Sequence, residues 1–148
     1  MKTADVCKRD VAVVRRDTPL VETARVMRER HGGCVVVVDE LRPGRPIGIV
    51  TDRDVVVEVV AAGMDPRTMC AGEIMSAPLV TAREDDDALE ALRAMRFRGV
   101  RRVPVVDAEG FLAGIATLDD LLELAGEALN DVVGAITSER SLEGMRRR

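Results

Sequence analysis

An internal duplication constrains the fold of this chain more than any other feature of its sequence. Identical residues recur at a spacing of 68 residues along the first part of each copy and of 66 residues along the last part. The spacing changes in the Pro- and Gly-containing stretch 40–46, which reads as a turn two residues longer than its counterpart 108–112. The matching pairs include Arg15/Arg83, Asp17/Asp85, Glu22/Glu90, Met27/Met95, Val35/Val103, Gly48/Gly114, Thr51/Thr117 and Asp54/Asp120.

Each copy repeats the same order of apolar patterns. A short extended stretch leads into an amphipathic helix, two β-branched runs of strand length follow, and a second helix ends the copy. Two copies are too few for a solenoid, and half of a 148-residue chain has too small a core to fold alone. The predicted fold class is therefore α/β (α+β-like), with two β-α-β-β-α units packed as a pseudo-two-fold symmetric pair. The predicted strands are 11–14, 35–38 and 47–50 in the first copy and 79–81, 103–106 and 112–116 in the second.

The composition excludes several function classes. Aromatic residues make up only 1% of the chain and the net charge is −4, so a base-stacking nucleic-acid surface is not expected. The basic tail 146–148 is interpreted as a solvated end. Cys7, Cys34 and Cys70 have neither disulfide-framework nor zinc spacing, and no apolar run approaches the ~20 residues of a membrane span. We expect a cytoplasmic protein with no metal site and no membrane or nucleic-acid partner.

The sequence offers no set of catalytic residues. His31 is the single histidine, and the glycines that follow it indicate a helix end rather than a ligand or a base. A nucleophile with a base and an orienting group cannot be assembled from the remaining residues. The chain is therefore not expected to be an enzyme.

The repeated signature is GIVTDRD at 48–54 and GIATLDD at 114–120. Each has a glycine, two apolar residues, a threonine and, three residues later, an aspartate at a strand-to-helix junction. The glycine lets the backbone approach a ligand, the threonine caps the helix, and a carboxylate in the first turn can accept both hydrogens of a ribose diol. The same Thr-x-x-Asp spacing is also a capping box, a purely structural device. Both interpretations stay open, and one position set can serve both.

On these motifs and the duplicated order of elements, the chain resembles the CBS-domain family from about residue 3 to residue 131. The resemblance implies a tandem CBS pair, also called a Bateman module, with two clefts that can hold AMP, ADP, ATP or S-adenosylmethionine and with no required cofactor. The strongest nucleotide-binding candidates that it implies are Gly48, Thr51, Asp54, Gly114, Thr117, Asp120 and, for phosphate, Arg102.

The resemblance also implies an apolar slot for the adenine and further contacts to the phosphate. The weaker candidates are Val14, Val35, Val36, Arg53, Thr81, Arg101, Val103 and Pro104, with Val13 and Val80 beside them. The two copies differ at the basic positions. The first copy has Gly33 and Cys34 where the second has Arg101 and Arg102, and Arg53 of the first copy corresponds to Asp119 of the second.

The expected function is that of a regulatory sensor that passes its ligand state to an unknown partner protein. The alternative is a ligand-free scaffold for protein contacts or dimerisation. The domain prediction is a first CBS motif with its lead-in at 1–66, a second at 67–131, and a helical extension with a basic tail at 132–148. A long apolar stripe near the C-terminus favours a homodimer. Its residues are Leu121, Leu122, Ala125, Leu129, Val132, Val133 and Ile136.

Overall fold

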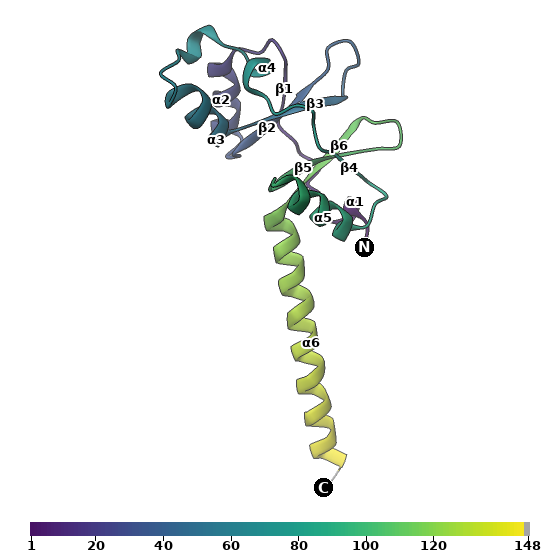
Figure 1. Cartoon of the computed structure of the whole chain (residues 1–148). Coiled ribbons are helices and arrows are strands. Elements are labelled where there is room, and N and C mark those ends of the chain that lie inside the picture. Colours follow the sequence, from purple (N-terminus) through teal and green to yellow (C-terminus); the bar gives the residue numbers. More distant parts are fainter. Residues whose placement is uncertain (147–148) are drawn as a thin grey trace.

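Each repeat folds around its own three-stranded sheet, and the two sheets with their helices form the body of the molecule (Figure 1). The computed structural model describes residues 1–146. The first repeat contains β1 (Val13–Arg15), α2 (Leu20–Glu29), β2 (Cys34–Val38), β3 (Pro46–Thr51) and α3 (Asp52–Asp54), which runs on into the π-helical turn η1 (Val55–Val60). The second repeat contains β4 (Ala82–Arg83), α5 (Ala88–Arg98), β5 (Arg102–Val106), β6 (Leu112–Thr117) and α6 (Leu118–Arg146). Helix α1 (Thr3–Val6) precedes the first repeat, and η2 (Pro66–Thr68) and α4 (Ala71–Ile74) lie between the two repeats.

The two sheets have the same topology. In each, the first strand is parallel to the second, and the third pairs with the second in antiparallel fashion. Val35 lies opposite Val50 and Val103 opposite Ala116, and an irregularity follows Val37 and Val105 at the corresponding place. The predicted fold class, two β-α-β-β-α units forming a pseudo-two-fold pair, is confirmed.

Each repeat has a separate aliphatic core under its sheet. The predicted core methionines Met27 and Met95 are both buried, the first among Val14, Val35, Val37 and Val50, the second among Ala91, Val103, Val105 and Ala116. Side chains alternate along a strand, so Val36, which is fully buried but outside these two clusters, points to the opposite face of its sheet. Pro104 is its counterpart and is also fully buried.

The lead-in segments are exchanged between the repeats. Helix α1 precedes the first repeat but packs on the second: Thr3 N donates to Asp86 O at 2.7 Å and Lys8 N to Ile115 O at 2.9 Å. Helix α4 precedes the second repeat but packs on the first: Gly72 N donates to Arg16 O and Ser76 N to Ile49 O, both at 2.9 Å. Each core is therefore completed by a segment that the sequence places next to the other repeat.

Two predicted elements differ from the structure. Strand β4 begins at Ala82, so the predicted strand 79–81 is wrong; ladder pairing to β5 starts only at Ala82 opposite Val105. In the second helix of the first repeat only Val59 is fully buried, while Val56 and Val60 are exposed, because the π-helical turn rotates the apolar positions away from a single face. Helix α6 continues through Gly126, Gly134 and Gly144 to Arg146 (Figure 1).

The predicted helix end at His31 agrees with the structure. Helix α2 ends at Glu29, His31 has a positive φ of 51°, and Gly32 N closes the end on Met27 O at 3.0 Å. Of the basic tail, Arg147 and Arg148 lie outside the described residues. None of the helices in residues 1–146 combines the length and the apolar content needed to span a bilayer.

Candidate functional site

A cleft of about 530 Å³ lies between the signature of the first repeat and the beginning of the second repeat, and we call it the Asp54 cleft. The first repeat contributes the end of β3 and helix α3. The linker after α4 and the turn between α5 and β5 supply the remainder. The lining residues are Ile49, Thr51, Asp52, Arg53, Asp54, Ser76, Pro78, Leu79, Val80, Gly99, Val100, Arg101 and Arg102. Of the predicted candidates, the structure brings together Thr51, Arg53, Asp54, Val80, Arg101 and Arg102.

The Thr-x-x-Asp signature forms a reciprocal capping box at the mouth of this cleft. Asp54 N donates to Thr51 Oγ1 at 3.1 Å, and Thr51 N donates to Asp54 Oδ2 at 2.8 Å. Within residues 1–146, Asp54 Oδ1 has no hydrogen bond or ion pair. The structural role of the motif is therefore met, and one carboxylate oxygen is still available to a ligand.

Three arginines line the same cleft. Arg102 begins β5 and is half-buried, whereas Arg53 and Arg101 are exposed. Arg101 forms a long ion pair with Asp119, 3.4 Å between Nη2 and Oδ1, and both side chains are largely exposed. In the described part of the chain, no carboxylate lies within ion-pair distance of Arg53 or Arg102. A guanidinium without an internal anion is free to pair with a phosphate.

The equivalent positions of the second repeat form what we call the Asp120 site: Thr117 and Asp120, with Lys8, Gly33 and Cys34 in the places of Ser76, Arg101 and Arg102. Both of its carboxylate oxygens have partners within the protein. Lys8 Nζ lies 2.7 Å from Asp120 Oδ1, and Thr117 Oγ1 donates to Asp120 Oδ2 at 2.6 Å. Burial would raise the pKa of Asp120, but the hydrogen bonds from Lys8 and Thr117 outweigh it, so this pKa lies below its ordinary value.

The two signature glycines contact protein rather than open space. A Cβ on Gly48 would lie 2.5 Å from Met75 Sδ, and a Cβ on Gly114 would lie 2.8 Å from both Cys7 Sγ and Lys8 O. The predicted reason for these glycines, close approach to a ligand, is therefore corrected: they admit the exchanged lead-in segments. Gly48 and Gly114 are required for this packing whether or not a ligand binds.

Several of the weaker candidates lie away from the Asp54 cleft. Val35, Val36, Val103 and Pro104 are fully buried and Val14 nearly so, because both faces of the middle strands are covered. Thr81 is exposed but lines a different cavity, of about 250 Å³, beside Pro46 and Val106. Val13 is exposed and is absent from the cleft lining. None of these residues lines the Asp54 cleft, and of the predicted adenine slot only Val80 does.

Apart from the predicted Val80, the apolar lining comes from residues that the sequence argument missed. Leu79 and Val80 are half-buried in the linker before β4, and Val100 lies in the turn after α5. Leu79 was predicted as strand, and the structure frees its side chain for the cleft. The exchange of lead-in segments causes this placement, and apolar periodicity within one repeat carries no signal for it.

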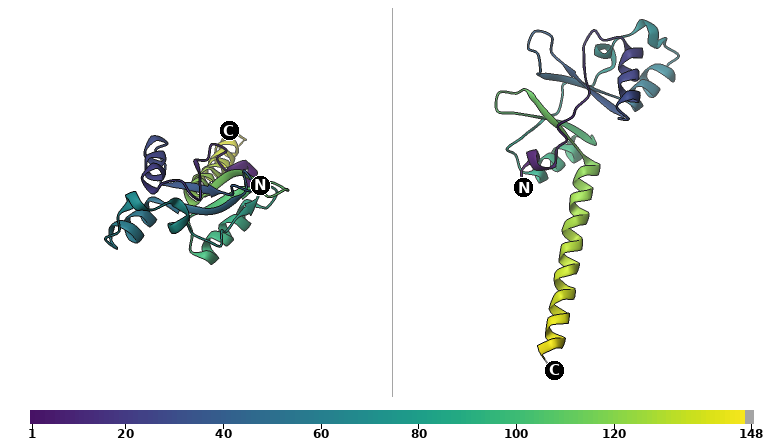
Figure 2. Two further views of the ribbon diagram at one scale, coloured as in Figure 1. Left: turned by 90° about the horizontal axis from the view of Figure 1, so that it is seen from above. Right: turned by 180° about the vertical axis from the view of Figure 1, so that it is seen from behind.

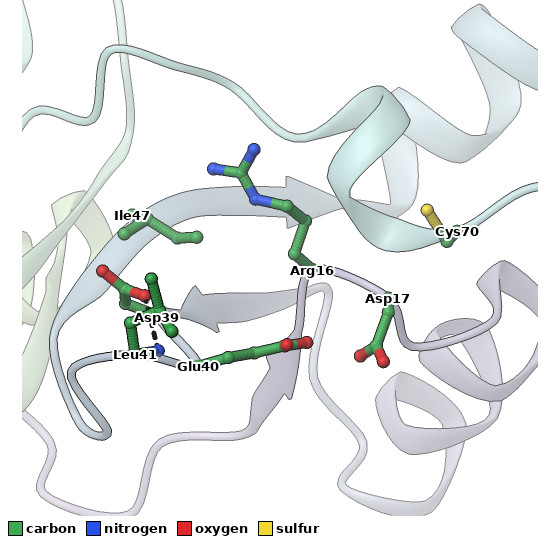
Figure 3. A pocket seen from close by; sticks show the side chains of 7 residues that line it. All are labelled: Arg16, Asp17, Asp39, Glu40, Leu41, Ile47 and Cys70. Carbon is green, nitrogen blue, oxygen red and sulfur yellow. Dashed lines mark hydrogen bonds between the residues drawn. The ribbon is translucent and has the colours of Figure 1, made fainter.

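A larger cavity, of about 620 Å³, lies on the other side of the first repeat (Figure 3). Figure 3 shows Glu40 extended toward Asp17, with Asp39 nearby and Arg16 above them. A hydrogen bond with Asp17 and the repulsion between the two carboxylates raise the pKa of Glu40. Three acids against one arginine disfavour an anionic ligand here, so we place the candidate site in the smaller Asp54 cleft.

The described residues contain no cluster of three or more His, Cys, Asp or Glu side chains that could hold a metal ion. The three cysteines are all free. Burial raises the pKa of the Cys34 thiol, which stands at the position equivalent to Arg102.

Comparisons with known proteins agree with this architecture. The family model described as the CBS domain matches residues 4–61 and 71–127. The chain is 41% identical over 124 residues to the uncharacterized protein MK0525 of Methanopyrus kandleri, covering 84% of this chain and 62% of that protein. It is 35% identical over 144 residues to hypoxic response protein 1 of Mycobacterium tuberculosis, covering 96% of this chain and 99% of that one.

Two solved structures have the same fold. The crystal structure of hypoxic response protein I, with two coordinated zinc ions, superposes with a TM-score of 0.74 at 32% identity, covering 83% of this chain and 98% of that chain. The CBS domain protein PAE2072 of Pyrobaculum aerophilum, complexed with AMP, superposes with a TM-score of 0.75 at 28% identity, covering 85% of this chain and 99% of that one.

Proposed function

Because this chain belongs to the CBS-domain family, we propose that it is a regulatory module that binds an adenine nucleotide in the Asp54 cleft. The observation that carries the proposal is the free Oδ1 of Asp54, which shares the cleft with the half-buried Arg102. A carboxylate that accepts a ribose diol and a guanidinium that pairs with phosphate are the two polar anchors that a nucleotide needs. A relative of similar fold is known as a complex with AMP, which supports this ligand class.

The remaining lining suits the base. Leu79, Val80 and Val100 offer apolar surface, and a volume of about 530 Å³ lies within the range of small-molecule sites, roughly 300–1,000 Å³. The acidic Asp52 is also present, but three arginines outnumber the two aspartates in the cleft. We therefore expect ligands with at least one phosphate to bind more tightly than adenosine.

The Asp54 cleft joins the two repeats, so a bound nucleotide would contact both of them. A ligand that prefers one arrangement of the repeats shifts the equilibrium between arrangements by its difference in affinity. We propose that this shift is read by a separate partner protein, and that the chain itself catalyses no reaction.

One observation favours the second candidate function, a ligand-free scaffold. Both Thr-x-x-Asp motifs are complete as capping boxes without any ligand, and Lys8 already neutralises Asp120. On this alternative the Asp54 cleft is only a by-product of the fold.

Thermal unfolding with AMP, ADP, ATP, S-adenosylmethionine and NAD tests the proposal. A ligand at 100 times its dissociation constant stabilises the fold by about 2.7 kcal/mol, and we expect AMP to do so. Calorimetry on Arg102→Ala should show a larger loss of affinity for AMP than for adenosine. The matched control is Arg28→Ala, an exposed arginine of α2 outside the cleft lining, which should bind AMP as the parent does. If none of the five molecules raises the unfolding temperature, the scaffold alternative holds.

A further inference from the structure

A second cavity, of about 430 Å³, adjoins the Asp54 cleft, and we call it the methionine cavity. Residues of α3, η1 and α4 line it, together with two methionines from the segment between η1 and α4. Asp54 and Ser76 line both cavities, so the Asp54 carboxylate stands at the boundary between them. The lining residues of the methionine cavity are Asp54, Glu58, Met64, Met69, Glu73, Ile74, Met75 and Ser76.

The two cavities differ in charge. Three arginines line the Asp54 cleft, against two aspartates. The lining of the methionine cavity has the carboxylates of Asp54, Glu58 and Glu73 and contains no lysine, arginine or histidine. An anionic group that moves from the cleft past Asp54 would therefore leave the guanidinium groups and approach carboxylates, which repel it.

Neither glutamate is neutralised by a cation of the protein. Within residues 1–146, the Glu58 carboxylate takes part in no hydrogen bond or ion pair. Glu73 Oε2 accepts a hydrogen bond from Cys70 N at 2.7 Å, which caps α4, but Glu73 forms no ion pair in the same range. Most of helix α6 projects away from the body (Figures 1 and 2), and none of its residues lines either cavity. The negative charge beside Asp54 therefore comes from η1 and α4.

The sugar of a nucleotide in the Asp54 cleft would face this boundary. On the proposed function, Asp54 Oδ1 accepts the hydrogens of the 2′- and 3′-hydroxyl groups, and phosphates on the 5′ oxygen pair with Arg102. A substituent on the 2′ or 3′ oxygen removes one of these donors and lies beside Asp54, where the methionine cavity begins. A phosphate at that position would meet Asp54 first, with Glu58 and Glu73 beyond it.

We propose that the methionine cavity makes the site selective for adenine nucleotides that carry all their phosphates on the 5′ oxygen. Asp54, Glu58 and Glu73 repel a phosphate on the 2′ or 3′ oxygen, whereas the arginines of the cleft attract one on the 5′ side. This inference rests on the proposed function and narrows its ligand class. It admits AMP, ADP and NAD, and it excludes molecules such as NADP and coenzyme A, whose adenosine carries a 2′- or 3′-phosphate.

Calorimetry with three isomers tests the selectivity. ADP, adenosine 2′,5′-bisphosphate and adenosine 3′,5′-bisphosphate have the same atoms and differ in where the second phosphate is attached. We expect each bisphosphate to bind at least about tenfold more weakly than ADP, and the ratio to fall as salt is added, because salt screens exposed charges. The compound 3′-deoxy-ADP lacks the hydroxyl group without adding charge, so it should bind more tightly than the 3′,5′-bisphosphate. Bisphosphates that bind as tightly as ADP would overturn the proposal.

A double variant tests the role of the two glutamates. Glu58→Gln with Glu73→Gln removes both charges, and glutamine keeps an acceptor for Cys70 N. The affinity ratio between ADP and the 3′,5′-bisphosphate should then narrow to about threefold, since Asp54 still repels the phosphate. The matched control, Glu22→Gln with Glu29→Gln, removes the same charge from exposed positions of α2 outside both linings and should keep the ratio of the parent.

The outcomes separate this inference from the proposed function. An unchanged ratio in the cavity variant, or an equal narrowing in the control, would overturn the role of Glu58 and Glu73. Tight binding of ADP together with equally tight binding of the bisphosphates would overturn the selectivity alone and leave the nucleotide site standing. If neither AMP nor ADP binds to the parent, the proposed function fails, and this inference fails with it.

Discussion

Lys8 Nζ lies 2.7 Å from Asp120 Oδ1, whereas Ser76, at the position equivalent to Lys8, has no charge to offer Asp54. The two halves of a nearly symmetric molecule thus differ at the one carboxylate that each would use for a sugar. The arginine pair of the Asp54 cleft is likewise replaced by Gly33 and Cys34 at the Asp120 site. This asymmetry leads us to expect one nucleotide per chain.

Removing the charge of Asp54 or of Asp120, one at a time, tests which half of the molecule binds AMP. Asp54→Asn should weaken AMP binding by at least about tenfold, because hydrogen bonds to a charged acceptor are worth about 1.5–3 kcal/mol. Asp120→Asn should leave AMP affinity within about twofold of the parent. Calorimetry measures both, and equal losses in the two variants would show that the halves bind alike.

Placing a lysine at position 76, the equivalent of Lys8, tests why the two halves of the molecule differ. Ser76→Lys gives the Asp54 cleft the same residue that neutralises Asp120, and it should lower AMP affinity about fivefold, since an exposed ion pair is worth at most about 1 kcal/mol. Ser76→Met is the control of similar length without charge, and its affinity should stay closer to that of the parent. Equal effects of lysine and methionine would point to crowding rather than to charge.

The ion pair at Asp120 should also appear in the response to acid. A carboxyl whose pKa is lowered on folding stabilises the protein above its unfolded pKa, here the ordinary 3.8, and loses this contribution as the pH falls through its lower folded pKa. Lys8→Ser should raise the pKa of Asp120, as measured by carboxyl ¹³C NMR. Because Lys8 is exposed, the variant should lose no more than about 1 kcal/mol of stability at neutral pH, and the difference from the parent should shrink below pH 4. An unchanged pKa of Asp120 would contradict this pairing in solution.

The packing role assigned to the signature glycines predicts opposite effects of one substitution at two sites. Gly114→Ala should destabilise the fold by about 1–3 kcal/mol, because the new methyl would meet the backbone of Lys8. Gly134→Ala lies in open space on α6 and should stabilise the helix by about 1 kcal/mol. Urea unfolding measures both. A harmless Gly114→Ala would mean that the lead-in segment can move aside.

The sequence was sufficient to predict each repeat but not the way in which the repeats interlock. Strand periodicity and β-branching correctly predicted the middle strands, since Val35 and Val103 are buried by their own sheets. Thr51 and Asp54 could be placed together because capping geometry depends only on residues three apart. The ion pair between Lys8 and Asp120 spans 112 residues, and no local rule links positions so distant.

The placement of the adenine slot stays a prediction for the same reason. A run of valines indicates burial, but it does not show which neighbour each face packs against. The sequence therefore gave no reason to choose Leu79 over Val36 or Pro104 as a residue that contacts the adenine. The structure separates them because α4 packs on the first repeat and carries the following linker, with Leu79, across its sheet. The boundaries at 66/67 and 131/132 stay predictions.

The exchange of α1 and α4 has a consequence for any attempt to divide the molecule. A cut near residue 66 would leave the first fragment without Ala71, which is fully buried in its core, and the second without Thr3, which is fully buried against it. Each fragment would expose part of its aliphatic core to solvent. We expect the two fragments to reassociate into the folded protein when they are mixed. The duplication is thus visible in the sequence as two units, yet in three dimensions neither unit is self-sufficient.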